Sequence, residues 1–371
     1  MGTRRTAGAS IAQAPGPANP WRKAAAGVPR ARSLRGHLGR LGECSRPVGR
    51  GTVRRMQETH SLVKERSIER ERAQNLWSSF LRSVDPLARG AQLSADADFG
   101  FDRIGGLEGP KEEILTYACA ATNPEVYSNW GTFPPAGMLL IGRRGVGKEL
   151  LAKALASLTD TSFLRVDVPR MVLDVIHSGG KVGELIQAWS QILEEMPPLT
   201  VFFDELEFSQ AREIGTHRSD LPVGPIMDFL LELVGRTTVA HQHLVVGSTS
   251  HPDTLRHAFL VPGRFERVVE VNPVIPDDVI AALSIHAREA EERADRPLFD
   301  KIEWKRVVGP ADDATTGDWV RILHAVLRHK ARCEAAGETT APVTTRDLKE
   351  EAERFRQAQR RIYVSDGGNY L

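Results

Sequence analysis

Cysteine is scarce in this 371-residue chain, which contains only three, at positions 44, 119 and 333. They are far apart and odd in number, and the sequence has neither a CxxC pair nor the cysteine and histidine spacing of a metal site. We therefore expect reduced thiols in a cytoplasmic protein rather than a disulfide or zinc framework. Long apolar runs are also missing, since the longest, such as Met138 to Ile141, are strand-sized and far short of the roughly 20 residues of a spanning helix. The sequence predicts no membrane partner.

Acidic residues are almost absent from the first 55 positions, which carry 12 lysines and arginines and the single acid Glu43. The rest of the chain has the opposite balance, 37 basic against 47 acidic residues. Because phosphate contacts come mainly from clustered Lys and Arg, this acidic body predicts no specific nucleic-acid partner. The basic segment has no hydrophobic periodicity, so we expect residues 1–60 to be a disordered basic arm. Three interpretations stay open. The segment is an arm that binds nucleic acid or an acidic partner, a transit-like segment, or the product of a translation start wrongly assigned upstream of a true start at Met56.

Apolar residues recur at helical spacing from about Ser61 to Val84, among alternating Glu and Arg residues. A short coiled-coil arm and a helix packed on its own domain both fit this pattern. Residues 85–100, with Pro86, Gly90 and a run of Asp, Ala and Ser, indicate a linker. We therefore expect residues 61–98 to be a helix and a linker.

A strand, a glycine-rich turn and a helix are predicted between residues 138 and 155. The apolar run Met138 to Ile141 precedes the complete pattern GxxxxGK at residues 142–148. Glycines let the backbone N–H groups and the helix N-terminus face an anion, and Lys148 adds a point charge on the outer phosphates. The residues expected to bind phosphate are Gly142, Arg143, Arg144, Gly145, Val146, Gly147, Lys148, Glu149 and Leu150.

The position after Lys148 normally holds Ser or Thr, whose hydroxyl binds Mg²⁺, but here it is Glu149. A carboxylate at this point either binds the metal directly or repels the phosphates. Arg143 and Arg144 add positive charge beside it, and we expect them to compensate.

A second apolar run, Leu199 to Phe203, ends in the adjacent acids Asp204 and Glu205. A strand buried on both faces of a parallel sheet has this composition, and ligands bind at the carboxyl ends of such strands. We expect Asp204 to hold Mg²⁺ through its water shell, with Glu149 as a further metal ligand, and Glu205 to polarise an attacking water. The phosphate loop upstream strengthens this interpretation.

The histidines show no HExxH or other paired metal spacing, and no GxSxG elbow is present, which argues against a fused protease. His241 and His243 flank Gln242 before an apolar strand. We expect both histidines in a surface loop.

Several motifs follow one another in a set order from about Phe99 to Phe355. Together with the phosphate loop and the acids at 204 and 205, they resemble the AAA subfamily of the AAA+ ATPases, the group of proteasomal, membrane-protease and segregase ATPases. The further segments are similar to the adenine cradle, the approach to the phosphate loop, the sensor strand end, the arginine-finger segment and the lid signature, at residues 101–107, 134–137, 247–255, 262–267 and 316–319.

The resemblance implies roles for residues outside the phosphate loop. Ser250 takes the place of the polar sensor residue, which is usually Asn, and we expect slow hydrolysis because its side chain is shorter. Arg264 and Arg267 are the implied fingers, fixed charges that stabilise the transition state in a neighbouring subunit. The residues placed near the adenine and ribose are Ile104, Gly105, Gly317 and Asp318.

The resemblance also implies a fold and a function. We expect an α/β P-loop module with a parallel sheet over residues 99–272, followed by a small helical lid over residues 273–361. ATP and Mg²⁺ are the implied cofactors, and a homo-hexamer that remodels or unfolds a protein substrate is the implied machine. The pore loop aligns with residues 174–180, which have no aromatic side chain and leave Val175, Ile176 and His177 to grip a polypeptide. A nucleotide-binding scaffold or adaptor with little turnover is the alternative.

A flexible tail is predicted for residues 362–371, which contain a diglycine and end in Gly-Asn-Tyr-Leu. A diglycine followed by a penultimate tyrosine and a free carboxylate suits a pocket that captures chain ends. The last four residues resemble the Gly-Gln-Tyr-Leu tail with which bacterial proteasome-activating ATPases dock on the proteasome core particle. A core particle is therefore an expected partner, through Tyr370 and Leu371, with a frayed terminus as the alternative.

Overall fold

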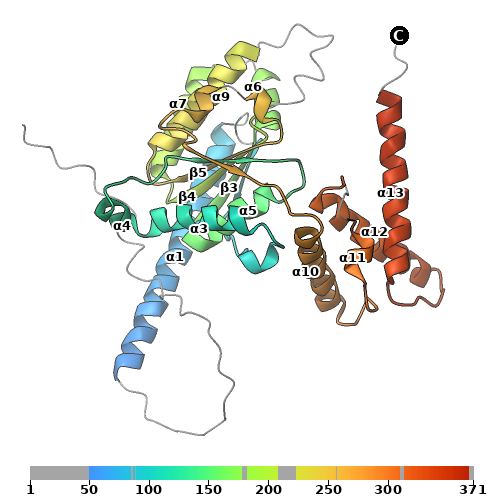
Figure 1. Ribbon diagram of the computed structural model, residues 1–371. Helices are drawn as coiled ribbons and strands as arrows, with labels where there is room; N and C mark the ends of the chain where they lie inside the picture. Colours follow the sequence, from blue (N-terminus) through green and yellow to red (C-terminus); the bar gives the residue numbers. More distant parts are fainter. Residues whose placement is uncertain are drawn as a thin grey trace, which may run out of the picture.

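The computed structural model describes residues 50–84, 87, 89–177, 182–207, 223–255, 257–309 and 313–366 (Figure 1). Side chains are described within these ranges between residues 66 and 361, except that of Val223. The predicted basic arm up to residue 49 and the tail motif at residues 368–371 lie outside the described residues. None of the helices in the described ranges has the length and apolar composition needed to cross a bilayer.

A six-stranded sheet lies at the centre of the fold. Its strands are β1 (Ala91–Ser94), β2 (Met138–Ile141), β3 (Ser162–Asp167), β4 (Leu199–Asp204), β5 (Leu244–Thr249) and β6 (Arg267–Glu270), in the order β1-β3-β4-β5-β2-β6. All neighbours pair in parallel except β1, which runs antiparallel to β3. β4 and β5 are mostly apolar and, except for Asp204, buried, as expected of parallel strands between two helical layers. The predicted α/β fold with a mostly parallel sheet is confirmed.

Helices cover both faces of this sheet (Figure 1). One layer contains α3 (Glu108–Thr122) and α5 (Lys148–Thr159), with the short α4 (Pro124–Asn129) after α3. The other layer contains α1 (Arg50–Ser83), α6 (Val168–His177), α7 (Val182–Glu195) and α9 (Val223–Val239). Each layer packs apolar side chains onto the sheet and forms its own buried core. Short 3₁₀ turns lie at Phe101–Arg103, Pro252–Thr254 and His257–Leu260.

A helical unit follows the sheet in the sequence. Among the described residues it consists of α10 (Asp277–Ala294), α11 (Trp304–Val307), α12 (Thr316–Ala335) and α13 (Thr345–Asp366). These helices enclose a core of their own around Leu283, Trp319 and Leu323. The prediction of a helical region after the sheet is confirmed, and α13 continues past the expected end at residue 361.

The first helix differs from the prediction in its length and its packing. α1 begins at Arg50, inside the predicted disordered arm, and its N-terminal half extends away from the sheet (Figure 1). In its C-terminal half, Ala73, Trp77 and Phe80 are buried, and Trp77 meets Trp189 of α7 edge to face with 6.2 Å between ring centroids. For this half, the structure supports a helix packed on its own domain rather than a coiled-coil arm.

The predicted linker contains a strand. β1 pairs with β3 along its whole length, from Ala91 opposite Val166 to Ser94 opposite Phe163. The short sequence of β1 carries little strand signal, so pairing with the existing sheet edge sets its conformation. The expectation of a linker is wrong at these residues because strand pairing is a tertiary effect.

His243 is buried and does not lie in a surface loop as predicted. Its Nδ1 accepts a hydrogen bond from Leu199 N at 3.2 Å, and its Nε2 lies 2.8 Å from Leu193 O. Both ring nitrogens are therefore engaged by backbone, a pattern that fits the neutral tautomer with its proton on Nε2. Burial lowers the pKa of His243 to about 4.

We expect this histidine to make folding pH-dependent. Its pKa is about 4 in the folded chain and 6.5 in the unfolded chain, so the unfolded state binds more protons between these values and stability is lost as the pH falls through them. The free energy of unfolding should drop by about 2–3 kcal/mol between pH 7 and pH 4.5 from this group alone. Urea unfolding at both pH values measures the drop against His243→Asn, whose side-chain oxygen can replace Nδ1 but does not titrate. An equal pH dependence in the two proteins would contradict the prediction.

Candidate functional site

The glycine-rich turn lies between β2 and α5, as predicted, and Lys148 is the first residue of α5. Gly147 caps this helix with φ +106°, a conformation that residues with a Cβ rarely adopt. The first N–H groups of α5 have no partner within the helix and favour an anion at this end. The loop therefore has the backbone that phosphate binding requires.

Lys148 is folded back onto its own loop. Its Nζ donates to Gly142 O at 2.5 Å, to Arg143 O at 3.0 Å and to Ser250 Oγ at 3.3 Å. The residue is 8% exposed, and burial lowers the pKa of its ammonium group, although nearby carboxylates oppose this effect. The structure thus brings two predicted residues, Lys148 and Ser250, within hydrogen-bond distance of each other.

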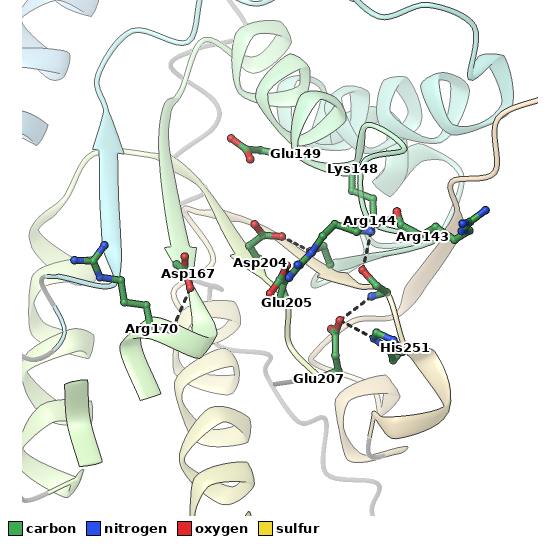
Figure 2. Close-up of polar contacts among 12 residues, drawn as sticks. Arg143, Arg144, Lys148, Glu149, Asp167, Arg170, Asp204, Glu205, Glu207 and His251 are labelled. Carbon is green, nitrogen blue, oxygen red and sulfur yellow. Dashed lines mark hydrogen bonds and ion pairs between the residues drawn. The ribbon is translucent and has the colours of Figure 1, made fainter. Parts of the chain in front are cut away.

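The two acids at the end of β4 lie beside the phosphate loop (Figure 2). Asp204 Oδ1 accepts a hydrogen bond from Ser248 Oγ at 2.7 Å, and Glu205 is ion-paired with Arg144 of the loop. Glu205 has φ +59°, which is uncommon for a residue with a side chain and concentrates at functional sites. The sequence prediction found both acids but missed Ser248, whose hydroxyl also accepts from Glu205 N at 3.2 Å.

Glu149 and Asp204, the predicted metal ligands, share a cation of the chain itself. Arg165 of β3 donates to Asp204 Oδ2 at 2.6 Å, and its Nε lies 3.5 Å from Glu149 Oε2. Lys153, one turn along α5, is 2.7 Å from Glu149 Oε1. The sequence prediction missed Arg165 because it stands inside a strand, with no motif spacing to mark it.

The two loop arginines have other partners. Arg144 pairs with Glu205, and Arg143 donates to Asp313 O at 2.8 Å. The expectation that these arginines offset the charge of Glu149 is therefore not met, because Arg165 and Lys153 do so instead.

Glu207, which the sequence prediction also missed, holds the sensor strand end. Its side chain is 1% exposed, and its Oε1 accepts a hydrogen bond from Ser250 N at 3.0 Å and lies 3.4 Å from His251 Nδ1 (Figure 2). Its Oε2 has no hydrogen-bond partner within the described part of the chain. A buried carboxylate that accepts from this backbone N–H fixes the place from which the Ser250 hydroxyl faces Lys148. The only sign in the sequence that Glu207 belongs to the site was its position two residues after Glu205.

Of the two residues predicted to lie near adenine, Ile104 belongs to the core between the sheet and the layer of α3 and α5, and Gly105 packs against the lid. Ile104 is buried, and Gly105 lies directly on the backbone of α10 at Ala282. A Cβ at position 105 would overlap the nitrogen and Cα of Ala282. Glycine is therefore needed here for a close backbone approach between the two units.

We expect Gly105→Ala to lower the free energy of unfolding by about 1–3 kcal/mol, because backbone cannot yield to the added methyl as a flexible side chain would. Urea unfolding measures this loss. Gly109→Ala is the matched control, since a Cβ there meets no atom within 4 Å and alanine favours the helix. Equal stability of the two variants would contradict the proposed packing.

Gly317 and Asp318 stand at the start of α12, next to the phosphate loop. Gly317 N donates to Gly145 O at 2.8 Å, which joins the lid to the loop. The Asp318 carboxylate accepts from Thr315 N at 3.1 Å and from Thr315 Oγ1 at 2.8 Å, as part of a capping box. The structure thus brings Gly317 to the phosphate loop, and the side chain of Asp318 caps α12. Their place near the adenine and ribose stays a prediction.

The two predicted arginine fingers are bound within their own chain. Arg264 donates to Ala258 O at 2.6 Å. Arg267 is ion-paired with Glu113 of α3, and the Arg267 hydrogen bond lowers the pKa of that carboxyl. Because a carbonyl contact is weaker than an ion pair, Arg264 is the more readily released of the two.

The described part of the segment aligned with a pore loop, residues 174–177, is helical. Val175 is buried and Ile176 packs against the same core, so these side chains belong to the inner face of α6 and are not free to grip a polypeptide. His177 ends the helix, and residues 178–181 lie outside the described residues.

Comparison with known proteins agrees with this geometry. The family model described as "ATPase family associated with various cellular activities (AAA)" matches residues 138–273. The proteasome-activating nucleotidase of Archaeoglobus fulgidus is 30% identical over 279 residues, which cover 73% of this chain and 65% of that protein. The one of Methanothermobacter thermautotrophicus is 33% identical over 54% of this chain and 49% of its own length. Proteasome-activating nucleotidase 1 of Haloferax volcanii is 29% identical over 64% of this chain and 57% of its own length.

The chain therefore spans between about half and 65% of the length of these relatives. The match covers the phosphate loop, the acids at the end of β4 and the arginine segment before β6. The order of the motifs, the parallel sheet and the family match agree, and residues 138–273 form a domain of the AAA family of ATPases.

Proposed function

We propose that this chain binds ATP at its phosphate loop and hydrolyses it to drive the remodelling or unfolding of a protein substrate. The observation that carries the proposal is the placement of Glu205 beside the loop that bears Lys148 (Figure 2). The relatives are named for activating a proteasome, which supports a protein as the substrate. The three dispersed cysteines support action in the cytoplasm.

Each residue would act from the place it now holds. Lys148 exchanges its two loop carbonyls for the outer phosphates, because an anion is the stronger acceptor. Glu205, released from Arg144, polarises the attacking water. Ser250 donates its hydroxyl proton towards the transferred phosphate from the position that Glu207 fixes.

Mg²⁺, which the family resemblance implies, does not fit the donor set as it is arranged. Asp204 and Glu149 offer carboxylate oxygens of the kind that Mg²⁺ accepts. Arg165, however, already contacts both of them, and an ion between the two carboxylates requires its displacement. The proposed hydrolysis is therefore assigned to Lys148, Glu205 and Ser250, with no step through the metal.

A ring of identical subunits, a homo-hexamer as the resemblance implies, would complete the site. In such a ring Arg264 and Arg267 of one subunit face the nucleotide of the next and stabilise charge in the transition state. Arg264 is the stronger candidate because only a carbonyl must release its guanidinium.

The proposed partner of the ring is a proteasome core particle, engaged through Tyr370 and Leu371. These two residues lie outside the described residues, but α13 leads to them and runs away from the rest of the lid (Figure 1). Deletion of residues 369–371 is expected to abolish co-sedimentation with a core particle and to leave ATP hydrolysis unchanged. Association that survives the deletion would overturn the docking proposal.

A nucleotide-binding scaffold with little turnover is the second candidate function. The ion pair between Arg144 and Glu205 favours it, because an engaged carboxylate is a poorer base. Glu149 and Ser250 favour it too, since each replaces the residue usual at its position.

Phosphate release by the full chain, with and without a chemically unfolded protein, separates the two functions. The remodelling enzyme predicts turnover that unfolded polypeptide stimulates, since substrate engagement is coupled to hydrolysis. Tight nucleotide binding with no more turnover than Lys148→Met shows would establish the scaffold instead.

A further inference from the structure

Arg165 stands between two carboxylates beside the phosphate loop. One terminal guanidinium nitrogen of Arg165 lies 2.6 Å from Asp204 Oδ2, and its Nε lies 3.5 Å from Glu149 Oε2. Its side chain is 30% exposed and that of Asp204 only 18%, so the contact with Asp204 is partly sheltered from water. Asp167 of the same strand lies at 3.9 Å and adds a third negative charge. One guanidinium therefore holds the two carboxylates that the sequence assigned to a metal.

The fold brings the side chains of Arg165, Asp204 and Glu149 together. β3 and β4 are neighbours in the sheet, with Asp167 opposite Asp204 at their carboxyl ends. Arg165 shares its face of β3 with Phe163, which packs in the core beneath α5. Glu149 is in the first turn of that same helix. A long side chain at position 165 therefore reaches both Asp204 and Glu149.

Charge balance explains why a cation is needed at this point. Replacing a neutral hydroxyl by the Glu149 carboxylate puts two negative charges beside the place where phosphates arrive. A guanidinium between them offsets this charge, remains protonated at any physiological pH and offers several donors in a fixed plane. A divalent metal ion in a protein is also bound by carboxylate oxygens, but here the cation between the two carboxylates is a side chain of the protein itself.

We propose that Arg165 is the resident cation of the nucleotide site, taking the place between Glu149 and Asp204 that a divalent metal would need. The chain then binds a nucleoside triphosphate with little dependence on divalent metal. The proposal rests on the proposed nucleotide binding. Lys153 also contacts Glu149, at 2.7 Å, but it makes no ion pair with Asp204 among the described contacts and serves as the matched control.

Mn²⁺ binding without nucleotide, followed by electron paramagnetic resonance on the full chain, tests the first part. Arg165→Gln removes the guanidinium shared by the two carboxylates and leaves only the contact of Lys153 with Glu149. This variant should bind Mn²⁺ at least about tenfold more tightly than the wild type, whereas Lys153→Gln should not differ from the wild type. Arg165→Lys keeps the charge and should still exclude the ion. Wild-type binding as tight as that of Arg165→Gln would overturn the proposal.

Affinity for a fluorescent ATP analogue, with Mg²⁺ or with EDTA, tests the second part. The wild-type dissociation constant should change by less than about threefold between the two conditions, a difference that needs no variant to fold. A loss of about tenfold or more in EDTA would overturn the proposal. If no nucleotide binds in either condition, the proposed function fails, and the Mn²⁺ experiment still decides the role of Arg165.

Discussion

Glu205→Gln is expected to lower steady-state phosphate release from ATP by about 10²–10⁴-fold and to leave nucleotide affinity nearly unchanged. Glutamine keeps the size of the side chain but cannot accept a proton from the attacking water. The backbone at this position, with φ +59°, is held by the hydrogen bond from Glu205 N to Ser248 Oγ, which the substitution leaves in place. Coupled phosphate-release assays and equilibrium binding on the same preparations measure the two quantities.

Arg144→Ala is the matched control for this prediction. It removes the same ion pair but leaves the carboxylate of Glu205 intact. Because Arg144 is also expected to bind phosphate, turnover is compared at saturating ATP, where it should survive in Arg144→Ala and disappear in Glu205→Gln. If both variants lose turnover equally, the ion pair and not the carboxylate is the functional feature.

Arg264→Ala should cost about 10³-fold or more in turnover, because an arginine that reaches the transferred phosphate neutralises charge that develops only in the transition state. Nucleotide affinity should fall much less. The contact with Ala258 O is the only hydrogen bond described for the Arg264 side chain, and a carbonyl releases a guanidinium easily. Phosphate release at saturating ATP measures the loss.

Arg267→Ala distinguishes the two arginines. Its guanidinium is engaged by Glu113, with Nε at 2.8 Å from Oε2, so we expect a smaller loss of turnover from this change. A larger loss in Arg267→Ala than in Arg264→Ala would reverse the assignment of the finger.

The phosphate loop and the acids of β4 were predictable because each is a short, local pattern. Gly147 and Lys148 are adjacent in sequence, and the backbone that they need is set within one turn. Asp204 follows a continuous apolar run, whose composition predicts a strand buried on both faces. The family resemblance added the order of the segments, and the parallel sheet confirms the fold that it implied.

The partners of these residues were not predictable from one sequence. Arg165 contacts Glu149 and Asp204 only because β3 pairs with β4 beneath α5, and no spacing along the chain encodes that. His243 is buried because the backbone at residues 193 and 199 closes around it. Trp77 joins the core because α1 docks on α7, whereas its helical pattern fitted a free arm equally well. Each miss is a contact between elements rather than a feature of one element.

We propose that ATP is hydrolysed at an interface between subunits, and mixing two inactive variants tests this proposal most directly. Glu205→Gln subunits still carry Arg264, and Arg264→Ala subunits still carry Glu205. Mixed rings then contain interfaces at which both groups are intact. We predict that phosphate release, absent from each variant alone, returns when the two are mixed. It should be highest when the two variants are present in equal amounts. Mixed rings that stay as inactive as either variant alone would contradict the account.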